Sequence, residues 1–467
     1  MSMTRPPDIR PVVAFDRFAL WCVLGLVGCG DGTGPLLEFP DQPAPDPQPP
    51  VVAFKDVRVV STQTDRSLEG QTVLVRDGTI EAVGPVASVS IPGGAFVVEG
   101  FGRYLMPALT DMHVHITEDT FEELRNDYLV YLANGVTTVR IMWGFRTMLN
   151  ERDSIDTGAL LGPDLFIASP GMDGPGGPWA ESTAPVATVA EARQTVAEYA
   201  AAGYDFIKVY NLLAPDVYEA IVDEAALHGI PLVGHVPGRV GIERVQSVDQ
   251  RTSEHFIGLK LAASSGFTAG TIDVSRVREL VTRSAAVGLW HTPTITVDAL
   301  SRDERDAIRA GHELGFIAPG VREFFESGFH HGLTGSTASR ERDNHELMIR
   351  EVDRAGAGLL VGTDAGFGWM LPGFSIHDEL DGIVAAGLEP SEVLKAARVN
   401  AAAALGVSGE MGQVIPGFRA DLILVPADPL RDVRAIRDHD GVMVRGRWLS
   451  RGTLDTWLEQ IRAGYGN

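Results

Sequence analysis

Pro107-Ala-Leu-Thr-Asp-Met-His-Val-His115 is the stretch of sequence that decides the fold. It has the apolar character of a buried strand, and two histidines stand two positions apart at its end. Because side chains two apart on a strand share one face, both imidazoles point the same way and can bind one metal ion. A β-rich segment precedes this stretch and alternating strand and helix patterns follow it. We therefore expect the first strand of an α/β domain that carries a metal site.

The alternating region extends from about residue 106 to 405. Its strand patterns fall at 135–140, 164–168, 206–209, 231–235 and 358–362, and helical patterns at 188–202, 216–228 and 274–287 separate several of them. Counting 109–115 as the first strand and 288–296 as the seventh gives eight parallel strands, which predicts a (β/α)8 TIM barrel. An open doubly wound sheet is the alternative, but no glycine-rich phosphate-binding fingerprint follows its first strand. Residues 298–357 are too long for a simple connection, and we expect extra helix over the barrel mouth.

Short strand patterns flank this α/β region on both sides. They occur at 57–60, 72–76, 79–83 and 95–99, with a hairpin signal at Asp77-Gly78, and again at 420–425 and 441–448. Residues 51–105 and 406–455 are therefore predicted to form one composite β-sandwich domain. Residues 456–467 are predicted to be a C-terminal tail.

The first 50 residues have the pattern of a targeting segment followed by a tether. Three arginines precede an apolar run at 18–28 that is too short to span a bilayer. Leu26-Val27-Gly28-Cys29 resembles a bacterial lipobox, which predicts a signal segment over 1–28 and a lipid on Cys29. A plain signal peptide and an uncleaved short anchor are the alternatives. The proline-rich residues 29–50 favour an extended tether, so we expect a lipid-anchored protein outside the cytoplasm, periplasmic or at the cell surface.

The cysteine content and the net charge limit the classes of partner that we expect. The only cysteines are Cys22 and Cys29, so a chain cleaved before Cys29 has no disulfide and no cysteine nucleophile. The formal net charge of −23 argues against nucleic acid or an anionic membrane face as the main partner. We expect a small-molecule substrate and membrane association only through the lipid, and leave association into a homo-oligomer open.

Four further residues have the chain order of metal ligands. Lys208 stands in Phe206-Ile-Lys-Val-Tyr210, Asp364 stands in Val361-Gly-Thr-Asp-Ala-Gly366, and His235 and His255 end or adjoin strands. The intervals between Lys208, His235 and His255 are each about one βα unit, so successive strands deliver them to one mouth. Taken singly, each has a structural alternative: a core histidine, an ion-paired lysine or a turn aspartate.

Together these residues resemble the amidohydrolase superfamily, and within it the prolidase-like and imidazolonepropionase-like amidohydrolases. Asp77–Gly84 and Gly412–Gly417 followed by Ala420-Asp-Leu422 add to a resemblance that covers about residues 52–452. Two features depart from the pattern: Ala108 stands where the family usually has glycine, and residues 246–253 are unusually polar for a barrel strand.

The resemblance implies a hydroxide held between two divalent metal ions, zinc foremost. It implies as ligands His113, His115, Lys208, His235, His255 and Asp364, with Lys208 bridging the metals as a carbamate and Asp364 also catalytic as proton shuttle. The implied reaction is cleavage of an amide, as in an Xaa-Pro or other dipeptide or an N-acyl amino acid. A cyclic amide or lactone hydrolase shares all six ligands, and a non-catalytic binding lipoprotein is the alternative of another class. Candidates for substrate contact are Tyr210, Arg239, His291 and His377.

Overall fold

The computed structural model describes residues 49–61, 65–116, 120–177, 179, 182–326 and 333–466. The predicted signal segment, Cys29 and nearly all of the tether therefore lie outside the described residues. Within the described ranges, no helix has both the length and the apolar character needed to cross a bilayer.

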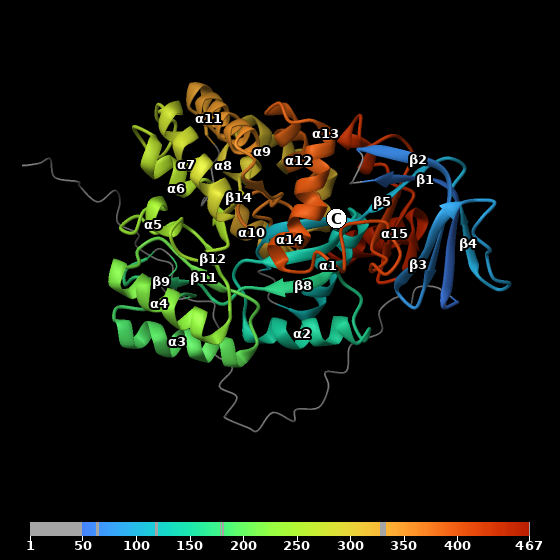
Figure 1. Ribbon diagram of the computed structural model, residues 1–467, viewed down its shortest axis with the longest axis horizontal. Coiled ribbons are helices and arrows are strands. Elements are labelled where there is room, and N and C mark those ends of the chain that lie inside the picture. Colours follow the sequence, from blue (N-terminus) through green and yellow to red (C-terminus); the bar gives the residue numbers. More distant parts are fainter. Residues whose placement is uncertain are drawn as a thin grey trace, which may run out of the picture. The chain divides into compact units, whose positions relative to one another are not determined.

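Strands from the two ends of the chain form one sheet. Its hydrogen-bonded order is β18-β17-β16-β5-β1-β2-β3, with β4 also paired to β1. The first part of the chain contributes β1 (Val51–Ser61), β2 (Arg66–Arg76), β3 (Thr79–Pro85), β4 (Phe96–Glu99) and β5 (Tyr104–Pro107), and the last part contributes β16 (Leu422–Val425), β17 (Gly441–Val444) and β18 (Arg447–Ser450). The two parts join where β5 pairs antiparallel with β16, so the blue and red strands of Figure 1 meet there.

The predicted sandwich is thus a single bent sheet in the structure. The rings of Phe54 on β1 and Trp448 on β18 meet edge to face at 5.2 Å, although β17, β16 and β5 lie between these strands in the pairing order. Side chains of this one sheet pack together into a hydrophobic core. In a sandwich, two separate sheets would contribute to that core. The pattern at 441–448, predicted as one strand, is a hairpin, because Arg445 and Gly446 both adopt positive φ and turn the chain.

The middle of the chain is a TIM-barrel-like α/β fold. Its parallel strands fall into short sheets: β6 (Leu109–Val114), β7 (Val136–Ile141) and β8 (Asp164–Ile167); β9 (Met172–Asp173), β10 (Ala184–Pro185), β11 (Ile207–Val209) and β12 (Leu232–Gly234); β13 (Thr252–Glu254), β14 (Trp290–Thr292) and β15 (Gly358–Leu359). Isolated parallel bridges join them at Ala168–Phe206, Leu232–Gln250 and Val114–Ala365. The ends of these strands therefore lie close enough to deliver side chains to one site.

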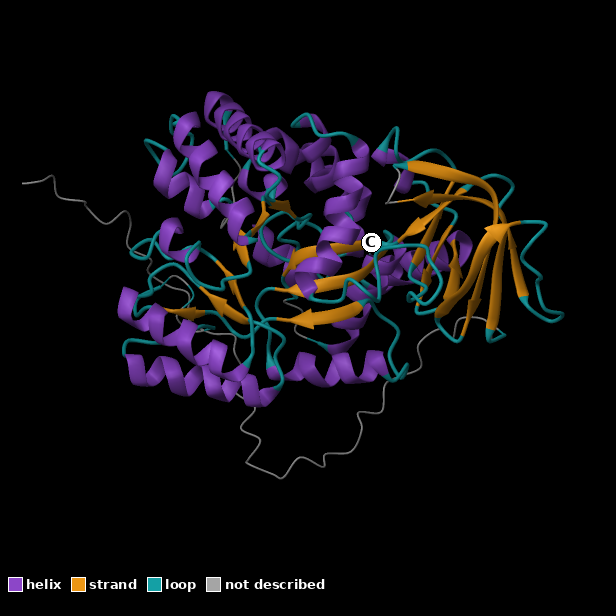
Figure 2. Cartoon of the chain, viewed as in Figure 1, coloured by secondary structure: helices purple, strands orange, loops and turns teal. Residues whose placement is uncertain are grey.

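Helices surround these strands (Figure 2). The helices before the long insertion are α1 (Phe121–Ala133), α2 (Arg146–Asp156), α3 (Val189–Ala202), α4 (Pro215–His228), α5 (Ile242–Val245), α6 (Ile257–Ala263) and α7 (Val274–Val287). The last turns of α3, α4 and α7 end at glycines in the left-handed region, as the sequence pattern indicates. The predicted helical stretches thus match the observed ones within one residue at each end.

The insertion after β14 carries helices, as expected from its length. It contains α8 (Ile295–Asp298), α9 (Arg302–Ala310), η1 (His312–Phe316), α10 (Pro319–Glu326) and α11 (Gly335–Arg354). The chain then passes through α12 (Ser375–Ala385), α13 (Pro390–Lys395), η2 (Ala396–Asn400), α14 (Ala401–Leu405) and η3 (Val433–Ile436).

The segment predicted as a C-terminal tail is instead most of a helix, α15 (Arg451–Gly464). Leu454, Trp457, Leu458 and Ile461 form its buried stripe, which packs in one hydrophobic cluster with α1 residues. The spacing of these four residues is that of one helix face, so the sequence does contain the signal.

Candidate metal centre

Three of the predicted ligands meet at the ends of β6 and β15. His113 Nε2 and His115 Nε2 lie 3.1 and 2.9 Å from the same oxygen, Oδ1 of Asp364. The backbone N–H of Asp364 donates to the carbonyl of His113 at 2.8 Å, which aligns the two segments. Asp364 has a φ of 63°, a strained conformation for a non-glycine residue and one typical of functional sites. The potential ligand atoms of these three side chains all lie within 4.8 Å of one another.

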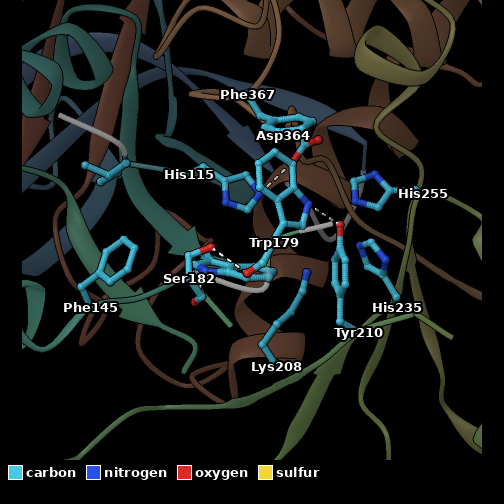
Figure 3. Close-up of a pocket in the computed structure, with 12 residues that line it drawn as sticks. His115, Phe145, Trp179, Ser182, Lys208, Tyr210, His235, His255, Asp364 and Phe367 are labelled. Atoms are coloured by element: carbon cyan, nitrogen blue, oxygen red, sulfur yellow. Dashed lines mark hydrogen bonds and ion pairs between the residues drawn. The ribbon is translucent and has the colours of Figure 1, made fainter. Parts of the chain in front are cut away.

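Lys208 projects from β11 toward the same place (Figure 3). Its side chain is buried, and its backbone N–H donates to the Ser169 hydroxyl at 3.0 Å. Burial lowers the pKa of Lys208 to about 8, although Glu254 and Asp364 partly oppose this shift. A substantial fraction of the amine is therefore neutral near physiological pH. Gly234 permits the approach of Lys208, since a Cβ at Gly234 would lie 3.0 Å from Lys208 Cδ.

His235 and His255 complete the group, and each has one ring nitrogen held by a neighbouring side chain. His235 Nδ1 is 2.8 Å from Asn211 Oδ1, and His255 Nδ1 is 2.7 Å from Thr294 Oγ1. The two rings lie 5.0 Å apart, centre to centre. Burial lowers the pKa of His255 to about 4 and that of His235 well below its usual value, so both rings are neutral. A hydrogen bond at Nδ1 leaves Nε2 as the nitrogen available to a metal.

Behind His113 lies a buried chain of polar groups that we did not predict. His113 Nδ1 is 3.0 Å from Glu254 Oε2, and the Arg140 guanidinium donates to Glu254 Oε1 at 2.9 Å. Arg140 also donates to the Met112 carbonyl and to the Thr252 hydroxyl. Burial by itself would raise the pKa of Glu254, but Arg140 and the His113 hydrogen bond outweigh it and hold that pKa well below its usual value. An ionised Glu254 fixes the His113 ring with Nε2 facing Asp364.

These residues fit a divalent metal ion. His113 Nε2 is a fully buried nitrogen with no hydrogen-bond partner in the described structure, and it faces the Asp364 carboxylate. Imidazole nitrogens together with a carboxylate oxygen are the donor set of zinc sites. A cation between them would bond the orphaned nitrogen and balance the buried negative charge.

The four candidates for substrate contact separate into two groups. Tyr210 lines the cavity beside the metal ligands. The other three do not line it: Arg239 is exposed after β12, His291 pairs with the Ser284 hydroxyl of α7 at 2.9 Å, and His377 is buried in α12. Burial lowers the pKa of His291 to about 4 and that of His377 to about 3, so both are neutral core histidines.

The cavity itself has a volume of about 230 Å³. It is lined by His115, Lys208, His235, His255 and Asp364, and by an aromatic wall of Trp143, Trp179, Tyr210 and Phe367. Figure 3 shows Tyr210 beside His235 and Phe367 beside Asp364. Sequence analysis did not identify Trp143, Trp179 or Phe367. Each stands in or next to a loop, where a single aromatic residue has no distinguishing pattern, although Phe367 is only three residues beyond Asp364.

With a TIM-barrel-like fold, a composite sheet domain and a histidine-rich carboxylate site, the molecule has the architecture of a metal-dependent hydrolase. Residues 104–449 match the model of the Amidohydrolase family, and the chain belongs to that family. This confirms the superfamily part of the predicted resemblance.

Similar proteins act on different substrates. Among solved structures, bottromycin amidohydrolase has a TM-score of 0.74 and 25% identity, with 90% of this chain and 91% of that chain covered. Ochratoxinase from Aspergillus niger is 22% identical over 421 residues, covering 77% of this chain and 78% of its own length. Adenine deaminase 3 from Rhizobium johnstonii is 26% identical over 391 residues, which cover 81% of this chain but only 55% of the deaminase. The chain therefore spans about half the length of the deaminase it matches.

Proposed function

We propose that this chain is a binuclear metal-dependent hydrolase that cleaves an amide bond in a small, peptide-like substrate. The observation that carries the proposal is the contact of Asp364 Oδ1 with both His113 Nε2 and His115 Nε2, beside a fully buried lysine. We further propose that the parallel strands close as a (β/α)8 barrel that brings all six ligands together, with His113 behind the five that line the cavity.

His113, His115, Asp364 and Lys208 would hold one zinc ion, and Lys208, His235 and His255 would hold a second. When bound, the two ions supply a water of lowered pKa and a Lewis acid for the substrate carbonyl. Asp364 receives the proton of that water. Burial alone would raise the pKa of Asp364, but His113 and His255 outweigh it and hold that pKa well below its usual value, so the carboxylate is ionised beforehand. Asp364 then returns the proton to the leaving amine.

In this proposal, a carbamate on Lys208 would help to hold both ions. The neutral amine attacks the carbon of carbon dioxide, a nitrogen–carbon bond forms, a carbon–oxygen electron pair moves to oxygen, and the nitrogen loses a proton to solvent. A cation that is costly to bury thus becomes an anion with two ligand oxygens. The lowered pKa of Lys208 supports the step because it supplies the unprotonated amine.

Tyr210 positions the substrate. Its hydroxyl accepts a hydrogen bond from Trp179 Nε1 at 3.2 Å, so the phenolic hydrogen is available to a substrate oxygen. Burial raises the pKa of Tyr210, and the phenol therefore keeps its proton at neutral pH.

The test is turnover by the zinc-loaded full-length protein on a panel read by mass spectrometry. The panel holds Xaa-Pro and other dipeptides, N-acyl amino acids, N-acyl amides, cyclic amides and lactones. Cleavage of an acyclic amide that is lost in both Lys208→Ala and Asp364→Asn supports the proposal. Cleavage confined to cyclic amides or lactones would replace the substrate class, and tight binding without turnover would favour a binding protein.

We also propose that residues 1–28 are removed and that a lipid on Cys29 holds the hydrolase outside the cytoplasm. A Cys29→Ser chain should lose labelled fatty acid and move from the membrane fraction to the soluble fraction. Unchanged labelling of that variant would contradict the lipid assignment.

A further inference from the structure

The aromatic wall of the cavity is held in place by its own contacts. Trp143 and Tyr210 meet edge to face with ring centres 5.3 Å apart, and Trp179 meets Phe367 in the same way at 5.4 Å. Trp143 Nε1 donates to the Ser182 carbonyl at 3.0 Å, and Trp179 Nε1 donates to the Tyr210 hydroxyl at 3.2 Å. The polar edges of both indoles are thus engaged within the protein, and the wall offers ring surface to a ligand.

The wall continues directly into the proposed reaction site. Phe367 lies 6.0 Å from the His115 ring, and Tyr210 lies 4.1 Å from the His235 ring, centre to centre. A group held among these rings therefore sits beside the proposed metal ligands.

Positive charge is scarce in this cavity. Of the described residues that line it, only Lys208 carries an ammonium or guanidinium group, and the proposed function uses Lys208 as a metal ligand. Arg239, which the sequence suggested as a substrate contact, is exposed and does not line the cavity. A carboxylate that packs on the aromatic wall, out of reach of the proposed metal ions, would lose its water without gaining a cationic side chain, which is costly.

Given the proposed function, on which the inference rests, we infer that the substrate is an uncharged aromatic amide. Its flat ring lies among Trp143, Trp179, Tyr210 and Phe367, and no free carboxylate stands next to the bond that is cleaved. Among the substrates in the panel, this favours N-acyl amides with an aryl side chain over Xaa-Pro dipeptides and free N-acyl amino acids.

Two matched pairs of compounds test the inference on the zinc-loaded full-length protein. N-benzylacetamide and N-(cyclohexylmethyl)acetamide differ in ring flatness at similar size, and a methylene insulates the amide from the ring. N-acetylphenylalaninamide and N-acetylphenylalanine differ in the carboxylate. We expect kcat/KM to be about 2- to 12-fold higher for the benzyl compound, the range to which aromatic-pair preferences convert. We expect the amide to exceed the acid by about tenfold or more.

Phe367→Leu should abolish the benzyl preference, because it keeps apolar volume but removes a ring. Phe101→Leu is the matched control: Phe101 is exposed in the turn before β5, away from the cavity, and the preference should persist there. The same pairs are then titrated calorimetrically into the metal-depleted protein, where no turnover occurs. The order of affinities should match the order of kcat/KM.

The outcomes separate the two proposals. Suppose that turnover is lost in Lys208→Ala but that the cyclohexyl compound is cleaved as well as or better than the benzyl compound, or the free acid as well as or better than the amide. This result would overturn the aromatic inference and would still support the proposed hydrolase. Absence of any Lys208-dependent turnover would refute the proposed function. The calorimetric order would then still decide whether the cavity selects an uncharged aromatic ring.

Discussion

Replacing Arg140 should destabilise the protein strongly, because it leaves the buried Glu254 carboxylate without its cationic partner. Arg140 is fully buried and donates to the Met112 carbonyl at 2.6 Å, to Thr252 Oγ1 at 3.1 Å and to Glu254 Oε1 at 2.9 Å. In Arg140→Met, the methionine side chain takes the place of the aliphatic part of arginine. Glu254, also fully buried, loses its cation. Breaking a buried pair in this way costs about 3–5 kcal/mol.

Removing the second charge should recover part of that loss. In Arg140→Met/Glu254→Gln no buried charge remains, so we expect the double variant to be at least about 1 kcal/mol more stable than Arg140→Met alone. Arg193→Met is the surface control: Arg193 and its partner Asp223 are exposed, and its other partner Glu224 is part-buried. Its loss should change the free energy of unfolding much less than the loss of Arg140.

The assay is urea unfolding of the metal-depleted full-length proteins at pH 7, followed by far-UV circular dichroism, with the slopes compared among variants. A loss below about 1 kcal/mol in Arg140→Met would refute the reasoning. So would a double variant whose loss equals the sum of the two single variants, because the charges would then be independent.

Three further outcomes are expected. Asn211→Leu removes the hydrogen-bond partner of His235 Nδ1, so zinc affinity should fall about 10–100-fold, as measured in competition with a chromophoric chelator. Unfolding of the metal-free protein should change little. Unchanged affinity would mean that Asn211 does not orient His235. Zinc at 100 times its dissociation constant should stabilise the wild type by about 2.7 kcal/mol, as measured by unfolding with and without chelator. The same zinc concentration should stabilise Asp364→Asn less. Equal stabilisation of both proteins would mean that the ion binds elsewhere. Burial lowers the pKa of His439 from 6.5 to about 4, so the unfolded chain binds a proton in this window and the folded chain does not. The wild type should therefore lose up to about 3 kcal/mol from this residue as the pH falls from 7 to 4, and His439→Gln should show a flatter profile; parallel profiles would contradict this.

Much of the candidate metal site could be predicted because the candidate ligands stand in or shortly after strands, each with a local pattern. His113 and His115 share a strand face, and Lys208 interrupts an apolar strand, where a charged residue is conspicuous. Glu254 and Arg140 could not be paired in advance, since they are 114 positions apart and only the fold brings them together. The polar segment before His255, which departs from the family pattern, now has a physical reason. Gln246 donates to the Leu280 carbonyl and to Ser284, and Gln250 accepts from the Tyr218 hydroxyl, so several of its polar groups are paired inside the protein.

The errors in the fold prediction also have local causes. The β pattern at 441–448 concealed a hairpin. Gly446 is the one turn signal within it, and the positive φ of Arg445 beside it is uncommon for arginine. The chain after residue 455 was taken as a tail, although its apolar residues have helical spacing. Arg239 and His377 were proposed because they follow candidate ligands in the sequence, and His291 because it belongs to the seventh strand. Neither position determines which way a side chain points, and in the structure these three residues do not line the cavity.

The pairing of β5 with β16 has a consequence for how the chain acquires its structure. Leu422 lies opposite Pro107, so more than three hundred residues must be made before β5 can pair with β16. Contacts this distant along the chain form slowly, because a very long loop has to close first. On the ribosome or during export, the leading strands β1 to β5 would emerge with the edge of β5 unprotected. The late strands β16 to β18 therefore complete the sheet last. A chain that ended before Leu422 would leave the edge of β5 without its partner strand.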